Sequence, residues 1–402
     1  MSATPELPIG EQLRAVRKAK GKTQESIAGL AGVTTEYLGQ IERGLKTPTI
    51  GVLHAFAAAL GVHVSTLLGE PRTNDAAQVH PAASQIQSAL MSYGSAAIAA
   101  EPAALESLRQ RVDGAWNVWQ SSPSRFTEAS QLLPALTVDV QRTVRALKGN
   151  PDAFREASQI SADLYFLLRT FTKRIGRADL SLIAADRGVL AAEDADDPLR
   201  IGAAKWNLGQ ILLAHGEPDG AEEVAFSTLD ALPALADASR DVAAVRGALA
   251  LVASIAAMRR GEVWVARDRL RDLASPAASV AGDGNVLWTV FGPTNVDLHA
   301  MSIEMESGEA SQALRQADRI DIEASPSLER QTTFYLDVAR VHEQQHDDSG
   351  VFVQLINAEA TSPEDMQYNP MARALVRNLL NRARPTLRPQ VVKLAKRVGV
   401  AG

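Results

Sequence analysis

The feature that most constrains this fold is a Gly-Glu pair that recurs at the end of apolar helical segments. It occurs at Gly216, Gly261 and Gly308, with spacings of 45 and 47 residues, and an alanine follows five residues after each glycine. Gly176 fits the same template 40 residues earlier, and His346 is a weaker match after the last pair. The pattern predicts a helix, a tight turn and a second helix whose small residue allows close packing. Because such hairpins cannot bury their apolar faces alone, we expect them to stack into a solenoid.

Sequence periodicity divides the chain into three parts. Residues 9–69 read as five short helices, residues 70–84 are polar and aperiodic, and helical patterns continue from about 103 to 398. No stretch alternates long enough to predict a sheet, and 46% apolar content is enough for a large core. We therefore predict an all-α chain with a small helical domain at 1–70, a linker at 71–102 and a helical repeat domain at 103–402.

Charge and composition narrow the possible partners. The net charge is −6, but residues 10–46 carry seven bases and four acids. This N-terminal segment, called the head below, therefore has a charge of +3, and the rest of the chain has a charge of −9. Such a head is typical of a protein that meets phosphates at one end only. The chain has no cysteine, which excludes disulfides and thiolate metal sites and fits a reducing compartment. With no signal peptide at the start and no apolar run near the roughly 20 residues that span a bilayer, we expect a cytoplasmic protein that does not contact a membrane.

Capping and turn signals define the helices of the head. Thr23 is a predicted N-cap for the second helix, Thr34 starts the third, and Gly32 lies where the turn between them needs a positive φ. The residues expected to face the core are Leu13, Val16, Ile27, Leu30, Leu38, Ile41, Leu53, Phe56, Leu60, Leu67 and Leu68.

This segment resembles the Cro/phage-repressor (XRE) helix-turn-helix family. The resemblance covers about sixty residues and rests on the turn glycines, the core spacing, Glu42-Arg43-Gly44 and the helix break at Gly61. It implies a lambda-repressor-like domain of five helices whose third helix enters the major groove. It also implies a homodimer on a palindromic operator of double-stranded DNA.

The resemblance assigns candidate DNA contacts to the second and third helices. The positions of Thr35, Glu36 and Gln40 read bases in the family, and glutamine, glutamate and threonine suit adenine, cytosine and the thymine methyl group. Gln24 corresponds to a position that contacts the DNA backbone, and Thr34 faces outward beside Thr35. Arg43 and Lys46 lie past the end of the third helix, where the DNA phosphates are expected to pass. The alternative for each is a solvated surface residue, which is the simpler interpretation of Arg14, Arg17 and Lys18. The candidates are Gln24, Thr34, Thr35, Glu36, Gln40, Arg43 and Lys46.

The Gly-Glu units resemble tetratricopeptide repeats, although they are longer than the usual 34 residues. Through the segments 288–296 and 375–395, the whole chain resembles large actinobacterial XRE regulators with a C-terminal tetratricopeptide-like domain. Related regulators bind a short signalling peptide in the concave groove, which implies a sensor for a peptide or small molecule. The repeat template places these candidates on the concave wall: Lys173, Trp206, Gln210, Arg259 and Asn295.

Each candidate on the concave wall has a simpler structural alternative. Asn295 either offers its amide to an extended peptide or caps the helix that follows Pro293. Trp206 and Trp288 either stack on a ligand or pack between repeats, and Arg259 either meets a carboxylate or ends a solvated helix. The tail 366–402, with eight bases and no acid, is expected to cap the solenoid.

One motif suggests an enzyme. His342-Glu343-Gln344-Gln345-His346 matches the H-E-x-x-H pattern of zinc peptidases, which places two imidazoles on one helix face. The match falls where the repeat template requires its turn, and only Glu359 and Glu364 are candidates for a third ligand. We therefore expect no metal, cofactor or catalytic activity, and the remaining alternatives are a zinc peptidase and a repeat-based adaptor with secondary DNA binding.

Overall fold

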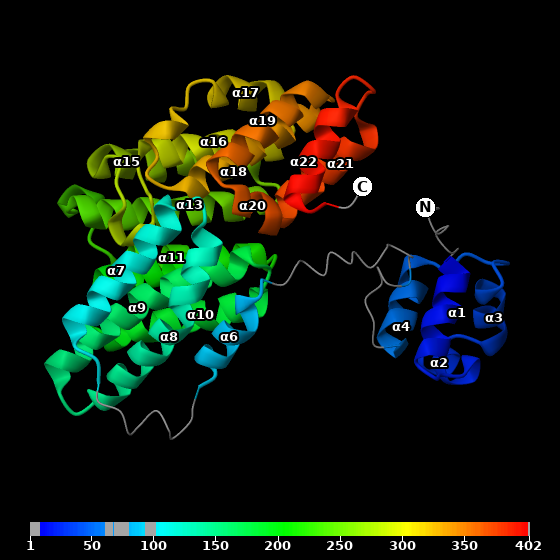
Figure 1. Ribbon diagram of the computed structural model, residues 1–402, viewed down its shortest axis with the longest axis horizontal. Helices are drawn as coiled ribbons and strands as arrows, with labels where there is room; N and C mark the ends of the chain where they lie inside the picture. The colour runs from blue at the N-terminus through cyan, green and yellow to red at the C-terminus, as the bar shows by residue number, and fades with distance from the viewer. Residues whose placement is uncertain (1–8, 61–66, 68–79, 93–101, 401–402) are drawn as a thin grey trace. The chain divides into compact units, whose positions relative to one another are not determined.

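A computed structural model of the chain describes residues 9–60, 67, 80–92 and 102–400. Contacts divide the chain into two compact units, residues 1–78 and 79–402. Every regular element in the described ranges is a helix, which confirms the all-α prediction (Figure 1). The two units are described separately below.

The first unit is a small helical domain with one apolar core. The hydroxyl oxygen of Thr23 accepts from the amide of Ser26 at 3.1 Å, which confirms the predicted N-cap of the second helix. Thr34 is the N-cap of the third helix, and its hydroxyl oxygen accepts from the amide of Tyr37 at 3.2 Å. Leu30 was predicted to be buried, but it is the last residue of a short helix and is 68% exposed. The predicted fifth helix lies outside the described residues, apart from buried Leu67. The described helices are α1 (Ile9–Ala19), α2 (Gln24–Leu30), α3 (Thr35–Glu42) and α4 (Ile50–Leu60).

The second unit is a tetratricopeptide-like solenoid in which helix pairs follow one another in chain order (Figure 1). The first helix of each pair packs on the first helix of a neighbouring pair. The pairs are α7 (Leu105–Ser121) with α8 (Arg125–Ala146), α9 (Pro151–Arg174) with α10 (Ala178–Asp194), α11 (Pro198–Ala214) with α12 (Pro218–Ala231), α13 (Arg240–Arg259) with α14 (Val263–Arg269) and α15 (Ser275–Ala281), α16 (Pro293–Glu306) with α17 (Ala310–Ala317), α18 (Leu328–Gln344) with α19 (Asp348–Thr361), and α21 (Pro370–Arg382) with α22 (Arg388–Val398).

The turns inside these pairs have the geometry that the repeat pattern predicts. Gly176, Gly216, Gly261 and Gly308 have φ between 76° and 85°, the left-handed region that favours glycine. His346 occupies the same turn position with a φ of 58°. The small residue five positions later is fully buried in each pair that has a glycine turn: Ser181, Ala221, Ala266 and Ala313.

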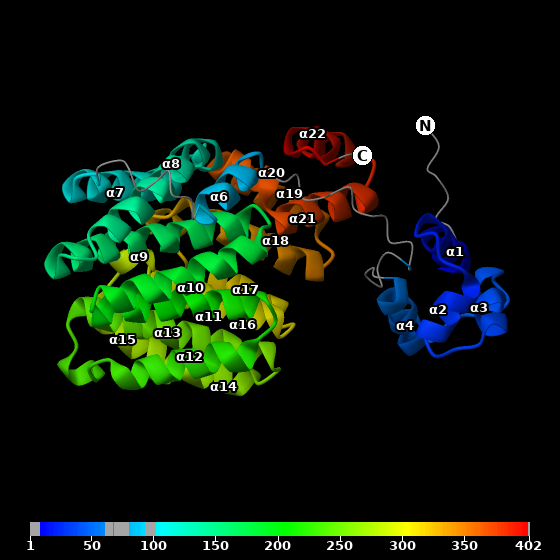
Figure 2. The ribbon, with the colours of Figure 1, turned by 90° about the horizontal axis from the view of Figure 1, so that it is seen from below.

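Part of the predicted linker is a helix of the second unit. Residues 82–90 form α6 (Ala82–Leu90), which packs on α8 (Figure 2). Its apolar face, with Ile86 and Leu90 at most 1% exposed, belongs to the same core as α7 to α11. The prediction of a linker over 71–102 is therefore wrong for this stretch, most of which lies beyond the aperiodic residues 70–84.

The apolar character of one core helix, α13, was also underestimated from the sequence. By length and composition alone, α13 is long and apolar enough to cross a bilayer, although no such run was expected. It is mostly buried, because α11, α12, α15 and α16 surround it. Contact on all sides explains why its sequence is apolar around the whole helix.

The helix array curves back on itself, so that its early and late repeats touch. The indole Nε1 of Trp119 on α7 donates to Glu329 Oε2 on α18 at 3.2 Å. Arg125 at the start of α8 pairs with Asp365 on α20 (Pro363–Tyr368), and neither side chain is more than 1% exposed. These contacts enclose the inner face of the early repeats, which is where the repeat template placed its candidate residues.

Candidate functional site

The first candidate surface is the outward face of α3. Thr34, Thr35 and Glu36 are exposed at its start, while Leu38 and Ile41 on the opposite side are buried in the core of the first unit. The turn before it has the predicted geometry, with Gly32 at a φ of 69°. The helix therefore presents its first turn to solvent on a rigid base, as a major-groove reader requires.

The other candidate contacts surround this turn. Gln40 is half-buried, and its amide Nε2 lies 3.4 Å from Glu36 Oε1. Arg43 and Lys46 are exposed beyond the end of α3, and the ammonium group of Lys46 lies 5.4 Å from the centre of the Tyr37 ring. Polar and cationic side chains are thus grouped along one edge of the unit.

Gln24 and Arg17 belong to a buried network that sequence reasoning missed. The guanidinium of Arg17 donates to both carboxylate oxygens of Glu42, at 2.6 and 2.8 Å, and Gln24 Nε2 donates to Glu42 Oε2 at 2.7 Å. Burial alone would raise the pKa of Glu42, but the hydrogen bonds from Arg17 and Gln24 lower it below its usual value. The network ties α1, α2 and α3 together, so Arg17 is not a solvated cation. The separation of 25 residues between Arg17 and Glu42 gave no local sequence signal.

The zinc-peptidase motif does not form the helical face that it needs. The helix α18 ends at Gln344, and His346 lies beyond it with a φ of 58°. His342 Nδ1 lies 3.0 Å from Asp347 Oδ2. The two candidate third ligands are engaged elsewhere: Glu359 pairs with Arg397, and Glu364 accepts from the amides of residues 126 and 127.

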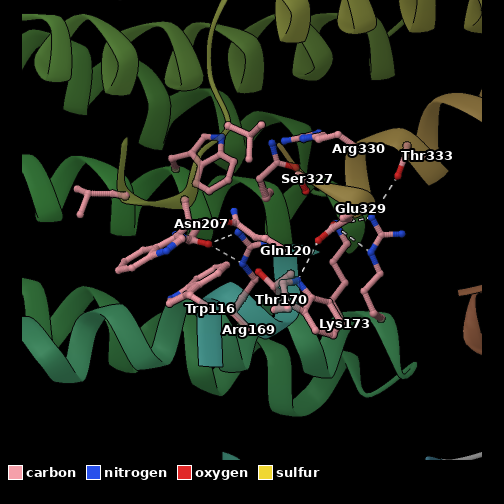
Figure 3. Close-up of a pocket in the computed structure, with 17 residues that line it drawn as sticks. Trp116, Gln120, Arg169, Thr170, Lys173, Asn207, Ser327, Glu329, Arg330 and Thr333 are labelled. Atoms are coloured by element: carbon pink, nitrogen blue, oxygen red, sulfur yellow. Dashed lines mark hydrogen bonds and ion pairs between the residues drawn. The ribbon is translucent and has the colours of Figure 1, made fainter. Parts of the chain in front are cut away.

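The second candidate site is a cavity of about 210 Å³ inside the repeat domain (Figure 3). Three of the five candidate ligand residues line it: Lys173 from α9, and Trp206 and Gln210 from α11. The far wall comes from α18 and from the segment that joins α15 to α16. The template therefore placed these three residues together, while the far wall depends on the curvature of the array.

Arg259 and Asn295 lie outside this cavity. Arg259 lines a neighbouring cavity of about 240 Å³ and pairs with Glu306 at 3.1 Å. The two cavities share Gln210, Arg330 and Thr333. Asn295 is 4% exposed, and its Oδ1 has no hydrogen-bond partner among the described residues. It does not cap α16, because Asp283 accepts from the amide and hydroxyl of Thr294 instead. The capping alternative is therefore wrong.

Cations dominate the wall of the first cavity. Arg169, Lys173, Arg174 and Arg330 line it together with a single carboxylate, Glu329. Burial, together with Arg169 and Arg174, lowers the pKa of the Lys173 ammonium group to about 7. Burial alone would raise the pKa of Glu329, but Arg174 and Arg125 hold it well below its usual range. Of these five residues the sequence interpretation had found only Lys173.

The aromatic wall of the cavity contains a strained segment. Trp288 stacks on Trp116 with ring centres 4.7 Å apart and planes 5° from parallel. Leu287, Trp288 and Val290 all line the cavity and have positive φ values of 45°, 59° and 51°. Non-glycine residues with such backbone angles cost free energy and persist where the surrounding structure fixes them, often at ligand sites.

Comparisons with known proteins match the first unit. A helix-turn-helix family model matches residues 13–67. The chain is 38% identical over 64 residues to the immunity repressor protein of Bacillus phage phi105, covering 16% of this chain and 44% of that protein. It is 38% identical over 58 residues to the HTH-type transcriptional regulator YazB of Bacillus subtilis strain 168, covering 14% of this chain and 84% of that protein.

Among solved structures, the Bacillus thuringiensis protein PlcR, in complex with the peptide PapR7 and DNA, overlaps 84% of this chain and 98% of its own. The sequence identity is 12% and the TM-score 0.31, which is too low to guide the assignment of a site.

Proposed function

Because the chain belongs to the helix-turn-helix family of transcriptional regulators, we propose that it binds a specific DNA operator and controls transcription in the cytoplasm. The supporting observation is the first turn of α3, which is exposed on one side and packed into the core on the other. A homodimer would place two such helices in successive major grooves of a palindromic site, about one helical turn apart.

The proposed contacts follow from the exposed side chains. Thr35 and Gln40 can read base edges, because a methyl group suits thymine and a side-chain amide can bind adenine with two hydrogen bonds. Glu36 can accept from a cytosine amine, which would break its weak contact with Gln40. The exposed cations Arg43 and Lys46 are placed to meet phosphates, which position the helix but carry no sequence information.

Operator binding by two alanine variants tests this proposal. Genome-wide footprinting with purified protein first identifies the operator. We expect Thr35→Ala and Gln40→Ala each to cost about 1–3 kcal/mol of operator binding, because each removes a base contact. Gln110→Ala, on an exposed surface of α7, is the matched control and should bind normally.

Two outcomes would contradict the assignment of the DNA-reading helix. One is equal operator affinity in wild type and in both α3 variants. The other is equal binding to operator and random fragments across a salt titration. Specific and non-specific binding should both weaken with salt, by about 0.9 log units per log unit of salt for each phosphate neutralised.

We further propose that a ligand in the repeat domain controls the DNA-binding head. Supporting this are the cavity in the repeat domain, its strained wall and its unusual charge. A ligand that binds one arrangement of the repeats better than another would shift the dimer toward that arrangement. The spacing of the two heads would change with it, and so would the ability to engage both half-sites.

A further inference from the structure

The wall of the 210 Å³ cavity carries positive charge that the protein does not neutralise. We propose that this cavity binds a small carboxylate whose acid group lies next to a flat aromatic ring. The proposal rests on the proposed function, since it names the chemical class of the ligand that controls the regulator. It is argued below from the ion pairs, the aromatic wall and the contrast with the neighbouring cavity.

Only one of the four cations around the cavity is matched by an acid. Arg174 pairs with Glu329 at 2.5 Å, which uses the single carboxylate of the wall. Arg169 donates to the neutral amide oxygen of Asn207, with Nε at 2.7 Å. Lys173 and Arg330 make no hydrogen bond or ion pair with any residue in the described part of the chain.

The placement of these cations favours an anion between them. Arg169 and Lys173 rise from α9 on one side of the cavity, and Arg330 faces them from α18 on the other (Figure 3). Cations held together without counter-charge repel one another and are costly to desolvate, and the attraction of an anion between them offsets both penalties. A carboxylate suits such a site, because guanidinium and ammonium groups donate charge-assisted hydrogen bonds to it.

The neighbouring cavity of about 240 Å³ shows that unpaired charge is not general in this domain. Its own cations are matched: Arg259 pairs with Glu306 at 3.1 Å, and Arg340 pairs with Asp337 at 3.3 Å. The shared residue Arg330 is the exception, and it lies where the two cavities meet. The excess of cations is therefore local to the first cavity.

Indole rings provide the apolar part of the site. Trp116, Trp119, Trp206 and Trp288 all line the cavity. Trp116 and Trp288 are already stacked on each other, and the guanidinium of Arg169 lies 5.3 Å from the centre of the Trp206 ring. A flat ring fits against such surfaces through stacking and edge contacts, while its carboxylate reaches the adjacent cations. An aliphatic acid would leave the indole surfaces without a matching partner.

Two sources can supply this chemistry, a free aromatic acid or the C-terminal residue of a peptide that ends in an aromatic side chain. The test is calorimetric titration of the full-length protein with two pairs of probes. The first pair is 1-naphthoate and its uncharged amide, 1-naphthamide. The second is N-acetyl-phenylalanine and N-acetyl-phenylalaninamide, which represent a peptide C-terminus with and without its charge. In at least one pair, we expect the acid to bind about tenfold or more tightly than its amide, because only the acid pairs with the cations.

Variants of the cations locate the site. Lys173→Met and Arg330→Met should each weaken binding of the preferred acid about tenfold and leave the amide unaffected. Lys148→Met, which removes an exposed lysine at the end of α8, is the matched control and should bind the acid normally. Because each cavity variant removes a charge without a partner, we also expect the ligand-free melting temperature to stay equal or rise. A folding defect would lower it.

The outcomes separate this proposal from the proposed function. Preference for the acid that is lost in Lys173→Met and Arg330→Met supports the anion site, and the probe pair that binds identifies the source. Acids that bind no better than their amides, or an acid preference that both variants retain, would overturn it. Operator binding is measured on the same samples without probe. A protein that binds its operator but not the acids fails only the present proposal, and one that binds the acids but no DNA fails the proposed function.

Discussion

At the scale of single residues, Glu42 links three helices of the first unit. It is the last residue of α3, yet its carboxylate accepts from Arg17 on α1 and from Gln24 on α2. The side chains of Arg17 and Glu42 are only 9% and 2% exposed. A carboxylate that is buried and shared in this way fixes the orientation of α3 relative to its two neighbours.

Replacing Glu42 with glutamine should destabilise the head and change its acid sensitivity. We expect Glu42→Gln to cost about 3 kcal/mol of local stability, because Arg17 stays buried without its counter-charge. Since the pKa of Glu42 is lowered on folding, its stabilising contribution is present above the unfolded value of about 4.3 and is lost as pH falls through the folded value. Hydrogen exchange of the amides of α1 to α3 measures both effects. Glu25→Gln, an exposed carboxylate on α2, is the control and should change protection little. Equal protection in Glu42→Gln and wild type would show that the network is dispensable.

At the scale of helices, the repeat units depend on one backbone conformation. Five of the hairpins reverse direction at a residue with a positive φ, which is glycine in four turns and His346 in the fifth. The buried small residue that follows lets the second helix of the pair pack closely on the first. The same turn is a source of strain where its residue has a side chain, as at His346.

Two glycine-to-alanine substitutions should have opposite effects. A Cβ would contact nothing within 4 Å at either Gly216 or Gly114, so only backbone preference separates them. Gly216 has a φ of 78°, and we expect Gly216→Ala to destabilise the repeat domain by about 1 kcal/mol. Gly114 lies inside α7, and Gly114→Ala should stabilise it by about 0.5–1 kcal/mol. Thermal or urea unfolding measures both, and changes of the same sign would contradict the argument.

At the scale of the whole repeat domain, contacts between distant repeats produce the cavity. Trp119 and Gln120 on α7 contact Glu329 on α18 and Asn285 before α16, and Arg125 pairs with Asp365 on α20. The helices involved are more than 160 residues apart in the chain, as the Gln120–Asn285 separation of 165 shows. Any change in the curvature of the solenoid must alter these contacts and the cavity together.

The buried ion pair between Arg125 and Asp365 should be the most sensitive of these contacts. We expect Asp365→Asn to destabilise the repeat domain by about 3–5 kcal/mol, because it leaves a fully buried guanidinium without its counter-charge. Asp179→Asn changes an aspartate that is 60% exposed in its pair with Arg177, and should cost less than about 1 kcal/mol. Urea unfolding of the full chain measures the difference. Similar midpoints for the two variants would show that closure of the array contributes little to stability.

The helices and turns could be predicted largely from the sequence because their signals are local. Thr23, Thr34 and Gly32 act within a few residues, and the glycine turns repeat at a regular interval. The failures have local causes too. Leu30 ends a short helix that buries only Ile27 and Ala28, and the alanine-rich α6 has the composition of a linker but packs in a core.

The sequence by itself determined that the chain is helical, that it begins with a short basic helix-turn-helix unit, and that its repeats are hairpins with Lys173, Trp206 and Gln210 on one wall. Tertiary structure alone decided the partners of Glu42 and the far wall of the cavity, where Glu329 and Arg330 face the early repeats. The physical reason is the distance along the chain over which each kind of interaction acts. Caps, turns and helical periodicity act between neighbours in the chain, whereas an ion pair or a cavity wall joins residues whose separation depends on how the helices curve together.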